Sequence, residues 1–174
     1  MSIYQSLMGL GEKVFKKHLL LKYGFNFSPM YRRSTGRITH ISEDLHYATM
    51  RLKLSYKNRN YVNSIYGGSM FSAVDPVPMI QLINILGPEY VVWDKAAKIQ
   101  FKRPAKEHLF AEFHFTVEEI AEIKSRVVNE NEIEILKTTD LTNKDKSKIY
   151  CQVHKTIYIA NKAYFKQKRS KKRD

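Results

Sequence analysis

The sequence predicts an α+β fold in which one long apolar helix is wrapped by about six mostly antiparallel strands. Residues 68–86 are apolar nearly all round, which is typical of a helix that other elements cover on several sides. Two strand-like segments precede this helix and four follow it, with turn-forming residues between them. The length of 174 residues suits a single domain with one sizeable core.

The chain opens with a segment that has helical periodicity. Its apolar residues recur at intervals of three or four positions, or sums of them, so residues 2–22 are expected to form an amphipathic helix. The positions on this stripe are Ile3, Leu7, Leu10, Val14 and Leu21. Packing on the domain or on another subunit is favoured over membrane contact. Residues 24–36, "GFNFSPMYRRSTG", contain Pro and Gly and are expected to be a loop.

The strands are identified by alternating or apolar runs between turn residues. Six strands are expected, over residues 36–42, 46–56, 90–104, 108–117, 132–141 and 148–160. Residues 118–126, between the fourth and fifth strands, are expected to form a helical turn or two. The resulting organisation is an N-terminal helix (1–25), a sheet-and-helix domain (26–160) and a basic tail (161–174).

The chain is strongly basic, with a formal net charge of +13. Residues 161–174 hold seven Lys or Arg and one Asp, a net +6, and such a run is expected to be disordered and solvated. Contact of this tail with polyanions is the alternative. Cys151 is the only cysteine, so an intrachain disulfide is excluded and a reducing compartment is favoured.

The N-terminal apolar run does not resemble a signal peptide, because Lys13, Lys16 and Lys17 interrupt it. No stretch offers the roughly 18 uncharged apolar residues of a membrane-spanning helix. The expected location is therefore the cytoplasm.

The segment before the buried helix, "NRNYVNSIYGGSMFSAVDP", concentrates polar and turn-forming residues. Its distinctive residues are Asn60, Asn63-Ser64, Tyr66-Gly67-Gly68 and Asp75-Pro76. This pattern resembles the hotdog-fold acyl-CoA thioesterases, in which a curved antiparallel sheet wraps a long central helix. It is most like a bacterial branch of tetrameric acyl-CoA thioesterases, many of unassigned function. That branch has Asn, a spacer, Gly-Thr, then His, Tyr or Phe before Gly-Gly, and an acid-proline pair further on.

The resemblance continues through Leu86–Lys106 and covers roughly residues 36–160. Two positions depart from it. Asn63 stands where relatives usually have Gly, and Asn is the non-glycine residue that best tolerates a positive φ. Tyr66 stands where many catalytic relatives carry His.

The chemistry of thioester cleavage explains the glycine pair. Unpaired backbone N–H groups at the start of a helix stabilise the negative charge that develops on the carbonyl oxygen. Gly67 and Gly68 allow the thioester to approach this backbone without a Cβ in the way. One such donor is worth about 2.7–4 kcal/mol in an acyl-transfer transition state.

The resemblance implies a role for further residues. Asp75 would be the general base or nucleophile, acting across a dimer interface, while Gly68 polarises the thioester and Asn60 orients water or the acyl group. Tyr66, Gly67, Ser64 and Asn63 would contact the substrate, and CoA phosphates would meet cations on the following strand. These cations are Lys95, Lys98, Lys102 and Arg103. A homodimer or homotetramer is implied, and no cofactor beyond the CoA of the substrate.

Structural interpretations of the same residues remain open. Asp75-Pro76 is also a typical helix start, with Asp as N-cap and Pro at the first position, which would break the helix in two. In a purely structural interpretation, Gly67-Gly68 forms a tight turn and has no other role. The lysines of the strand after the helix would then form a solvated face. The six histidines show no metal-binding spacing.

Two further functions compete with hydrolysis of a medium- or long-chain acyl-CoA. The protein can be a hotdog dimer that binds acyl-CoA, or acyl groups on a carrier protein, without turnover. It can also be an interaction protein that uses its basic tail on polyanions.

Overall fold

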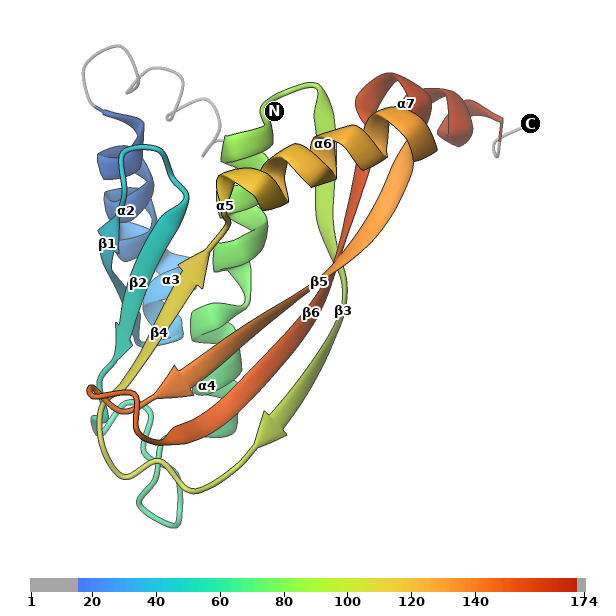
Figure 1. Ribbon diagram of the computed structural model, residues 1–174. Coiled ribbons are helices and arrows are strands. Elements are labelled where there is room, and N and C mark those ends of the chain that lie inside the picture. The colour runs from blue at the N-terminus through green and yellow to red at the C-terminus, as the bar shows by residue number, and fades with distance from the viewer. Residues whose placement is uncertain (1–15, 172–174) are drawn as a thin grey trace.

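The computed structural model describes residues 16–171, in which a strongly curved sheet wraps a central helix (Figure 1). The sheet has six strands in the order β1-β2-β4-β5-β6-β3, and every neighbouring pair is antiparallel. The strands are β1 (Gly36–Ile41), β2 (Tyr47–Leu52), β3 (Tyr90–Phe101), β4 (Leu109–His114), β5 (Glu132–Thr142) and β6 (Ile149–Asn161). The predicted fold class and number of strands are confirmed.

The central helix is split into two segments, α4 (Gly67–Val74) and α5 (Pro76–Leu86), with Asp75 between them. Their apolar side chains pack against the concave face of the sheet, where Leu109, Leu141 and Val153 are completely buried. Gly87 adopts φ 88° and ends α5. By length and composition the segment Gly67–Leu86 is also apolar enough to cross a membrane, but half of it is buried inside the protein. It is the core helix of the sheet.

The N-terminal region differs from the expected helix and loop. Helix α2 (Lys17–Phe27) continues past residue 22, and α3 (Pro29–Arg33) follows where a loop was expected. The reason is tertiary, because Phe25 and Tyr31 are buried in the main core and their rings meet edge to face. Of the expected stripe, Leu21 is buried, while the positions before residue 16 lie outside the described residues.

Helix α2 lies along β1, which is one edge of the sheet (Figure 1). The Asn26 side chain accepts from the Ile38 N–H and donates to the Ile38 carbonyl, both at 2.9 Å. An asparagine amide thus occupies the backbone groups that a further strand would use. The opposite edge is β3, a strand of 12 residues that is exposed over much of its length.

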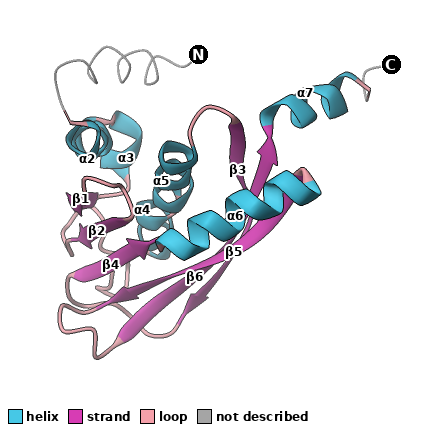
Figure 2. Cartoon of the chain, turned by 45° about the horizontal axis from the view of Figure 1, so that its top comes forward, coloured by secondary structure: helices cyan, strands magenta, loops and turns pink. Residues whose placement is uncertain are grey.

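Helix α6 (Val117–Glu130) is longer than the helical turn or two that was expected. Thr116 caps it by accepting from the Glu119 N–H at 3.1 Å. Ile120, Ile123 and Val127 are buried against the end of α5 and form a second apolar cluster with it. The helix therefore extends the cover of the sheet beyond the central helix (Figure 2).

The expectation that residues 161–174 are disordered is wrong for most of this tail, because Lys162–Ser170 forms α7. The side chain of Asn161 accepts from the Ala163 and Tyr164 N–H groups and caps the helix. Phe165 then contacts Trp93, with 5.1 Å between ring centroids, and Trp93 itself stacks on Tyr158 at 4.5 Å.

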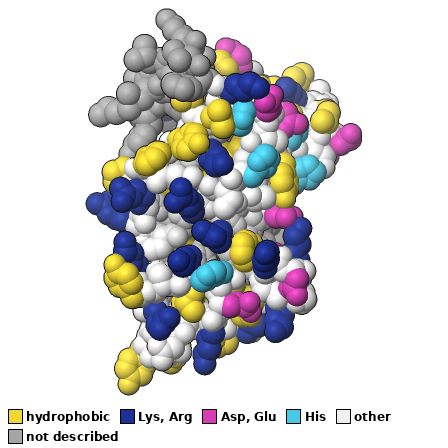
Figure 3. All heavy atoms as spheres, turned by 90° about the vertical axis from the view of Figure 1, so that its left-hand side faces the viewer, with side chains coloured by type: hydrophobic (Ala, Val, Ile, Leu, Met, Phe, Trp, Pro, Cys, Tyr) yellow, Lys and Arg dark blue, Asp and Glu magenta, His cyan; other side chains and the backbone are white. Residues whose placement is uncertain are grey.

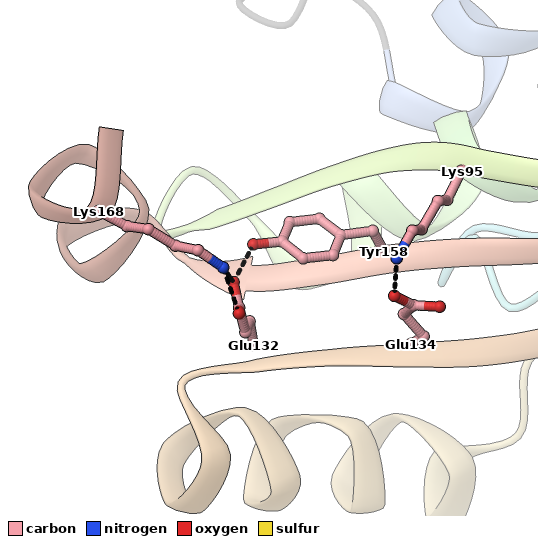
Figure 4. Close-up of polar contacts among 5 residues, drawn as sticks. All are labelled: Lys95, Glu132, Glu134, Tyr158 and Lys168. Carbon is pink, nitrogen blue, oxygen red and sulfur yellow. Dashed lines mark hydrogen bonds and ion pairs between the residues drawn. The ribbon is translucent and has the colours of Figure 1, made fainter. Parts of the chain in front are cut away.

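Lys168 of α7 is ion-paired with Glu132, which also accepts from the Tyr158 hydroxyl at 2.6 Å (Figure 4). Burial and this hydrogen bond raise the pKa of Tyr158, so the phenol stays protonated. Apolar and charged contacts together hold the basic segment against the convex face of the sheet.

Candidate active site

The loop before α4 is organised by Asn60. Its side-chain oxygen accepts from the backbone N–H groups of Val62 and Ser64 at 3.1 and 3.0 Å, and its amide donates to the Ser64 hydroxyl at 3.0 Å. Asn63 adopts φ 60°, the conformation anticipated for the position that relatives fill with Gly. Asn60, Asn63 and Ser64 thus form one turn, and the Asn60 side chain has its hydrogen bonds within it.

This turn delivers the chain to the start of α4. Tyr66 is the residue before the helix, and its N–H donates to the Asn58 carbonyl at 2.7 Å. The amides of Gly67 and Gly68 follow in the first turn of the helix, where N–H groups lack an intrahelical acceptor. Within residues 16–171 neither amide has an acceptor, so both remain available as donors.

Two aromatic rings lie against the glycine pair. A Cβ on Gly67 would come within 2.7 Å of the Phe101 ring, and one on Gly68 would overlap the Tyr66 ring. Tyr66 and Phe101 are themselves 60% and 54% exposed. The glycines therefore lie beneath surface aromatics rather than in the core, and each ring occupies the space that a Cβ would fill.

Asp75 lies at the junction of α4 and α5, and its carboxylate is ion-paired rather than acting as a side-chain cap. Its carboxylate accepts no backbone N–H of α5; instead Lys155 Nζ donates to its Oδ1 at 2.7 Å. The Asp75 side chain remains 38% exposed, whereas that of Lys155 is 2% exposed. The break in the helix that the capping interpretation implied is present, but the carboxylate faces the sheet.

The same lysine pairs with a second acid, Asp94 of β3. Lys155 Nζ donates to Asp94 Oδ2 at 2.5 Å and also to the backbone carbonyl of Asp75. Asp94 Oδ1 is buried without a hydrogen-bond partner. Burial raises the pKa of Asp94, and the nearby Asp75 acts in the same direction, while Lys155 opposes them. We call Asp75, Asp94 and Lys155 the acid–lysine cluster.

The glycine amides and Asp75 of one chain lie apart. Asp75 follows Gly68 by seven residues along a helix, an axial separation of about 10 Å at 1.5 Å per residue. A thioester carbonyl on the Gly67 or Gly68 amide is therefore out of reach of the carboxylate of the same chain.

The cations predicted to meet CoA phosphates lie away from the acid–lysine cluster. Lys95 is ion-paired with Glu134 on the convex face (Figure 4). Lys98 pairs in register with His154, whose ring bonds Thr138 on that same face. Lys102 donates to Gln100 Oε1 at 2.6 Å, and Arg103 is exposed just beyond β3. The structure thus does not bring Lys95 or Lys98 together with the glycine turn, because successive strand residues point to opposite faces.

Asp94 and Lys155 are the site residues that sequence reasoning missed. A signal for Lys155 was present, because it occupies an inward position of β6 between the buried Val153 and Ile157. A lysine at such a position requires a buried partner. Nothing in the pattern indicated that its partners would come from the central helix and from β3. Within residues 16–171, no three His, Cys, Asp or Glu side chains are grouped to hold a metal ion.

The architecture is that of the hotdog fold, and solved structures agree. A Pseudomonas aeruginosa protein of unknown function, described as a probable thioesterase, is 18% identical, with a TM-score of 0.68 over 83% of this chain and 93% of its own. A Chlorobaculum tepidum protein of unknown function is 16% identical, with a TM-score of 0.65 over 81% of this chain and 92% of its own. A Haemophilus influenzae thioesterase is 11% identical, with a TM-score of 0.60 over 83% and 90%.

Residues 16–159 match the family model described as "Domain of unknown function (DUF4442)", and the chain belongs to that family. No curated protein matches the chain. The structural likenesses, all at low identity, establish the hotdog fold.

Proposed function

We propose that the protein is a thioesterase that hydrolyses a medium- or long-chain acyl-CoA to the free acid and CoA. The observation that carries this proposal is the pair of unpaired Gly67 and Gly68 amides at the start of the central helix. They are the donors that a thioester carbonyl needs as it becomes tetrahedral. Similar hotdog structures described as thioesterases support the same class of reaction.

In the proposed mechanism the thioester oxygen accepts from these amides while the Asp75 carboxylate of a second protomer acts on the carbonyl carbon. As a general base, Asp75 removes a proton from water, the water oxygen bonds to carbon, the C–S bond breaks and the proton passes to the thiolate. As a nucleophile, the Asp75 carboxylate would instead bond to the carbonyl carbon and expel CoA as the thiolate, and water would then hydrolyse the resulting anhydride to the free acid and the Asp75 carboxylate. Lys155 fixes the carboxylate from behind in either case.

The geometry changes the role that we propose for Asn60. Its side chain is engaged with Val62 and Ser64, so it shapes the turn that presents the glycines rather than orienting water. We therefore propose Asn60 and Ser64 as positioning residues. Asn63 belongs to the same turn, while Tyr66 lies over Gly68 and would contact the acyl thioester.

The separation of the glycines and Asp75 within one chain supports a homodimer in which each protomer supplies one of the two groups. We propose that it forms along β3, the exposed edge of the sheet, and that two such dimers can associate into a tetramer. The cytoplasm is the proposed location, since the only cysteine, Cys151, is a free and buried thiol.

The test is release of free thiol from acyl-CoAs of graded chain length. Asp75→Asn should lower kcat by a factor of about 10²–10⁴, the usual contribution of a general base. Asp145→Asn, at an exposed loop acid, is the matched control and should keep full activity. Burial raises the pKa of Cys151 to about 11, so the protein's own thiol should stay silent in this assay. Full activity in Asp75→Asn would remove Asp75 from the mechanism.

A second candidate function is acyl-CoA or acyl-carrier binding without turnover. The Tyr66 ring over Gly68, in place of the His of many catalytic relatives, favours it. Saturable binding of acyl-CoA with no thiol release by the unmodified protein would support this function against hydrolysis.

A further inference from the structure

A hollow of about 530 Å³ lies between α2, α3, β1 and the segment that follows β2. We call it the α2–β1 pocket. Four exposed cations line it, and they come from three parts of the chain: Arg32, Arg37, Lys53 and Lys57. Its volume lies within the range of about 300–1,000 Å³ that is usual for small-molecule sites.

The charge of this region is unbalanced. Among residues 16–59 there are ten Lys or Arg and two acids, Glu43 and Asp44, in the turn after β1. Glu43 is already paired with Lys16, and no acid lines the pocket. Within residues 16–171 the four pocket cations have no carboxylate partner. Figure 3 shows Lys and Arg side chains gathered on this side of the molecule.

Aromatic side chains also line the α2–β1 pocket. Tyr23, Phe27 and Tyr56 are 51%, 71% and 85% exposed, which is unusual for large rings. Lys57 Nζ lies 5.8 Å from the centroid of the Tyr56 ring. Exposed rings beside unpaired cations are suited to a ligand with both a planar base and phosphates.

The pocket adjoins the proposed active site. Lys57 precedes Asn58, whose carbonyl accepts from the N–H of Tyr66, the residue before the glycine pair. On its other side, Gly36 approaches α4 so closely that a Cβ there would lie 2.9 Å from that of Ala73. A ligand that fills the pocket therefore lies beside α4, the first segment of the central helix.

We propose that the α2–β1 pocket binds the nucleotide end of acyl-CoA, with the adenine ring against Tyr56 or Phe27 and the phosphates on Arg37 and Lys53. This inference rests on the proposed function for the identity of the nucleotide. The pantetheine arm would then lead past Lys57 and Tyr66 to the glycine amides. In this proposal the phosphates meet cations of the N-terminal half rather than the cations predicted on β3.

The test measures binding of adenosine 3′,5′-bisphosphate by calorimetry, apart from any turnover. The double variant Arg37→Gln/Lys53→Gln should bind it at least tenfold more weakly, and Tyr56→Ala a few-fold more weakly. Lys124→Gln/Lys144→Gln removes the same charge elsewhere on the surface and should bind as the unmodified protein does. In the hydrolysis assay the pocket variant should raise KM for acyl-CoA more than it lowers kcat.

The outcomes separate the two proposals. Bisphosphate binding that depends on Arg37 and Lys53, without acyl-CoA turnover, would support the pocket as a nucleotide site and reject the proposed hydrolysis. Turnover of acyl-CoA without bisphosphate binding, and with an unchanged KM in Arg37→Gln/Lys53→Gln, would overturn the proposal that the pocket binds the nucleotide. Inorganic phosphate, ATP, a single-stranded oligonucleotide and vesicles with anionic lipid are compared in parallel. Binding of only the oligonucleotide or the vesicles through these residues would overturn the pocket as a CoA site.

Discussion

Lys155 is a charged side chain at the centre of an apolar sheet face, and its two carboxylate partners explain why it is tolerated there. Removal of one member of a buried ion pair leaves its partners uncompensated, which costs about 3–5 kcal/mol. Because the Asp75 side chain is 38% exposed, we place the effect at the lower end of this range.

Lys155→Met should therefore lower the free energy of unfolding by about 3 kcal/mol, measured by urea denaturation. Addition of Asp94→Asn to this variant should recover part of the loss, since one of the two uncompensated acids is removed. Lys95→Met breaks the exposed pair with Glu134 and should cost less than about 1 kcal/mol. Equal losses in Lys155→Met and Lys95→Met would show that burial of the cluster contributes nothing.

Asp94 predicts a dependence of stability on pH. Its pKa is raised in the folded state, so the native protein binds this proton more tightly than the unfolded chain. The resulting contribution to stability is fully present below the unfolded pKa of about 3.9 and is lost as the pH rises through the folded value.

Asp94→Asn lacks this titration. The free energy of unfolding of the unmodified protein minus that of the variant should therefore fall between pH 4 and pH 7, as measured by urea denaturation at each pH. A difference that rises over this interval would mean that Lys155, rather than burial, dominates the protonation of Asp94.

At the scale of elements, the strands were predictable and α7 was not. Alternating side chains and turn residues located all six strands and the central helix. The run of Lys and Arg in residues 161–174 indicated a solvated tail. The helix was missed because the contact that orders it, Phe165 on Trp93, joins distant parts of the chain. The Asn161 cap was visible in the sequence, yet a cap alone does not establish a helix.

The docking of α7 can be observed through Trp93, which is the only tryptophan of the chain. Removal of residues 162–174 should expose its ring to water and shift its fluorescence emission to longer wavelength. Phe165→Ala should produce a smaller shift in the same direction, whereas Lys171→Ala, beyond the end of α7, should produce none. Unchanged emission after truncation would show that α7 does not rest on Trp93 in solution.

The candidate site was predicted only in part, because some of its contacts are local in sequence and others join distant parts of the chain. The turn from Asn60 to Gly68 is local, so its positive φ and its free amides were anticipated. Asp75 was identified as an unusual acid in an apolar helix, but its partner Lys155 is 80 residues away. Cross-sheet ion pairs and the α2–β1 pocket arise only from tertiary structure, which no local pattern encodes.

For the whole molecule, the proposed dimer predicts a measurable mass. The protomer has a mass of 20.5 kDa, and sedimentation velocity should report twice that value at micromolar concentration. Ala96 lies near the middle of β3, where its two copies would face one another across a two-fold axis. Ala96→Glu places like charges there and should give monomers.

Ser125→Glu on the exposed side of α6 adds charge away from this edge and should remain a dimer. A monomeric unmodified protein would contradict both the β3 interface and the shared active site. Loss of thioesterase activity in the monomeric variant would connect the two.

The hydrogen bonds of Asn26 to Ile38 also bear on how many copies can join. A sheet with two open sides can add strands without limit, which is how fibres grow. Here the β1 edge is occupied by the side-chain amide of Asn26, so only the β3 edge can pair with another strand. When two copies pair through their β3 edges, the backbone groups of both edges are occupied, and the continuous sheet cannot be extended further.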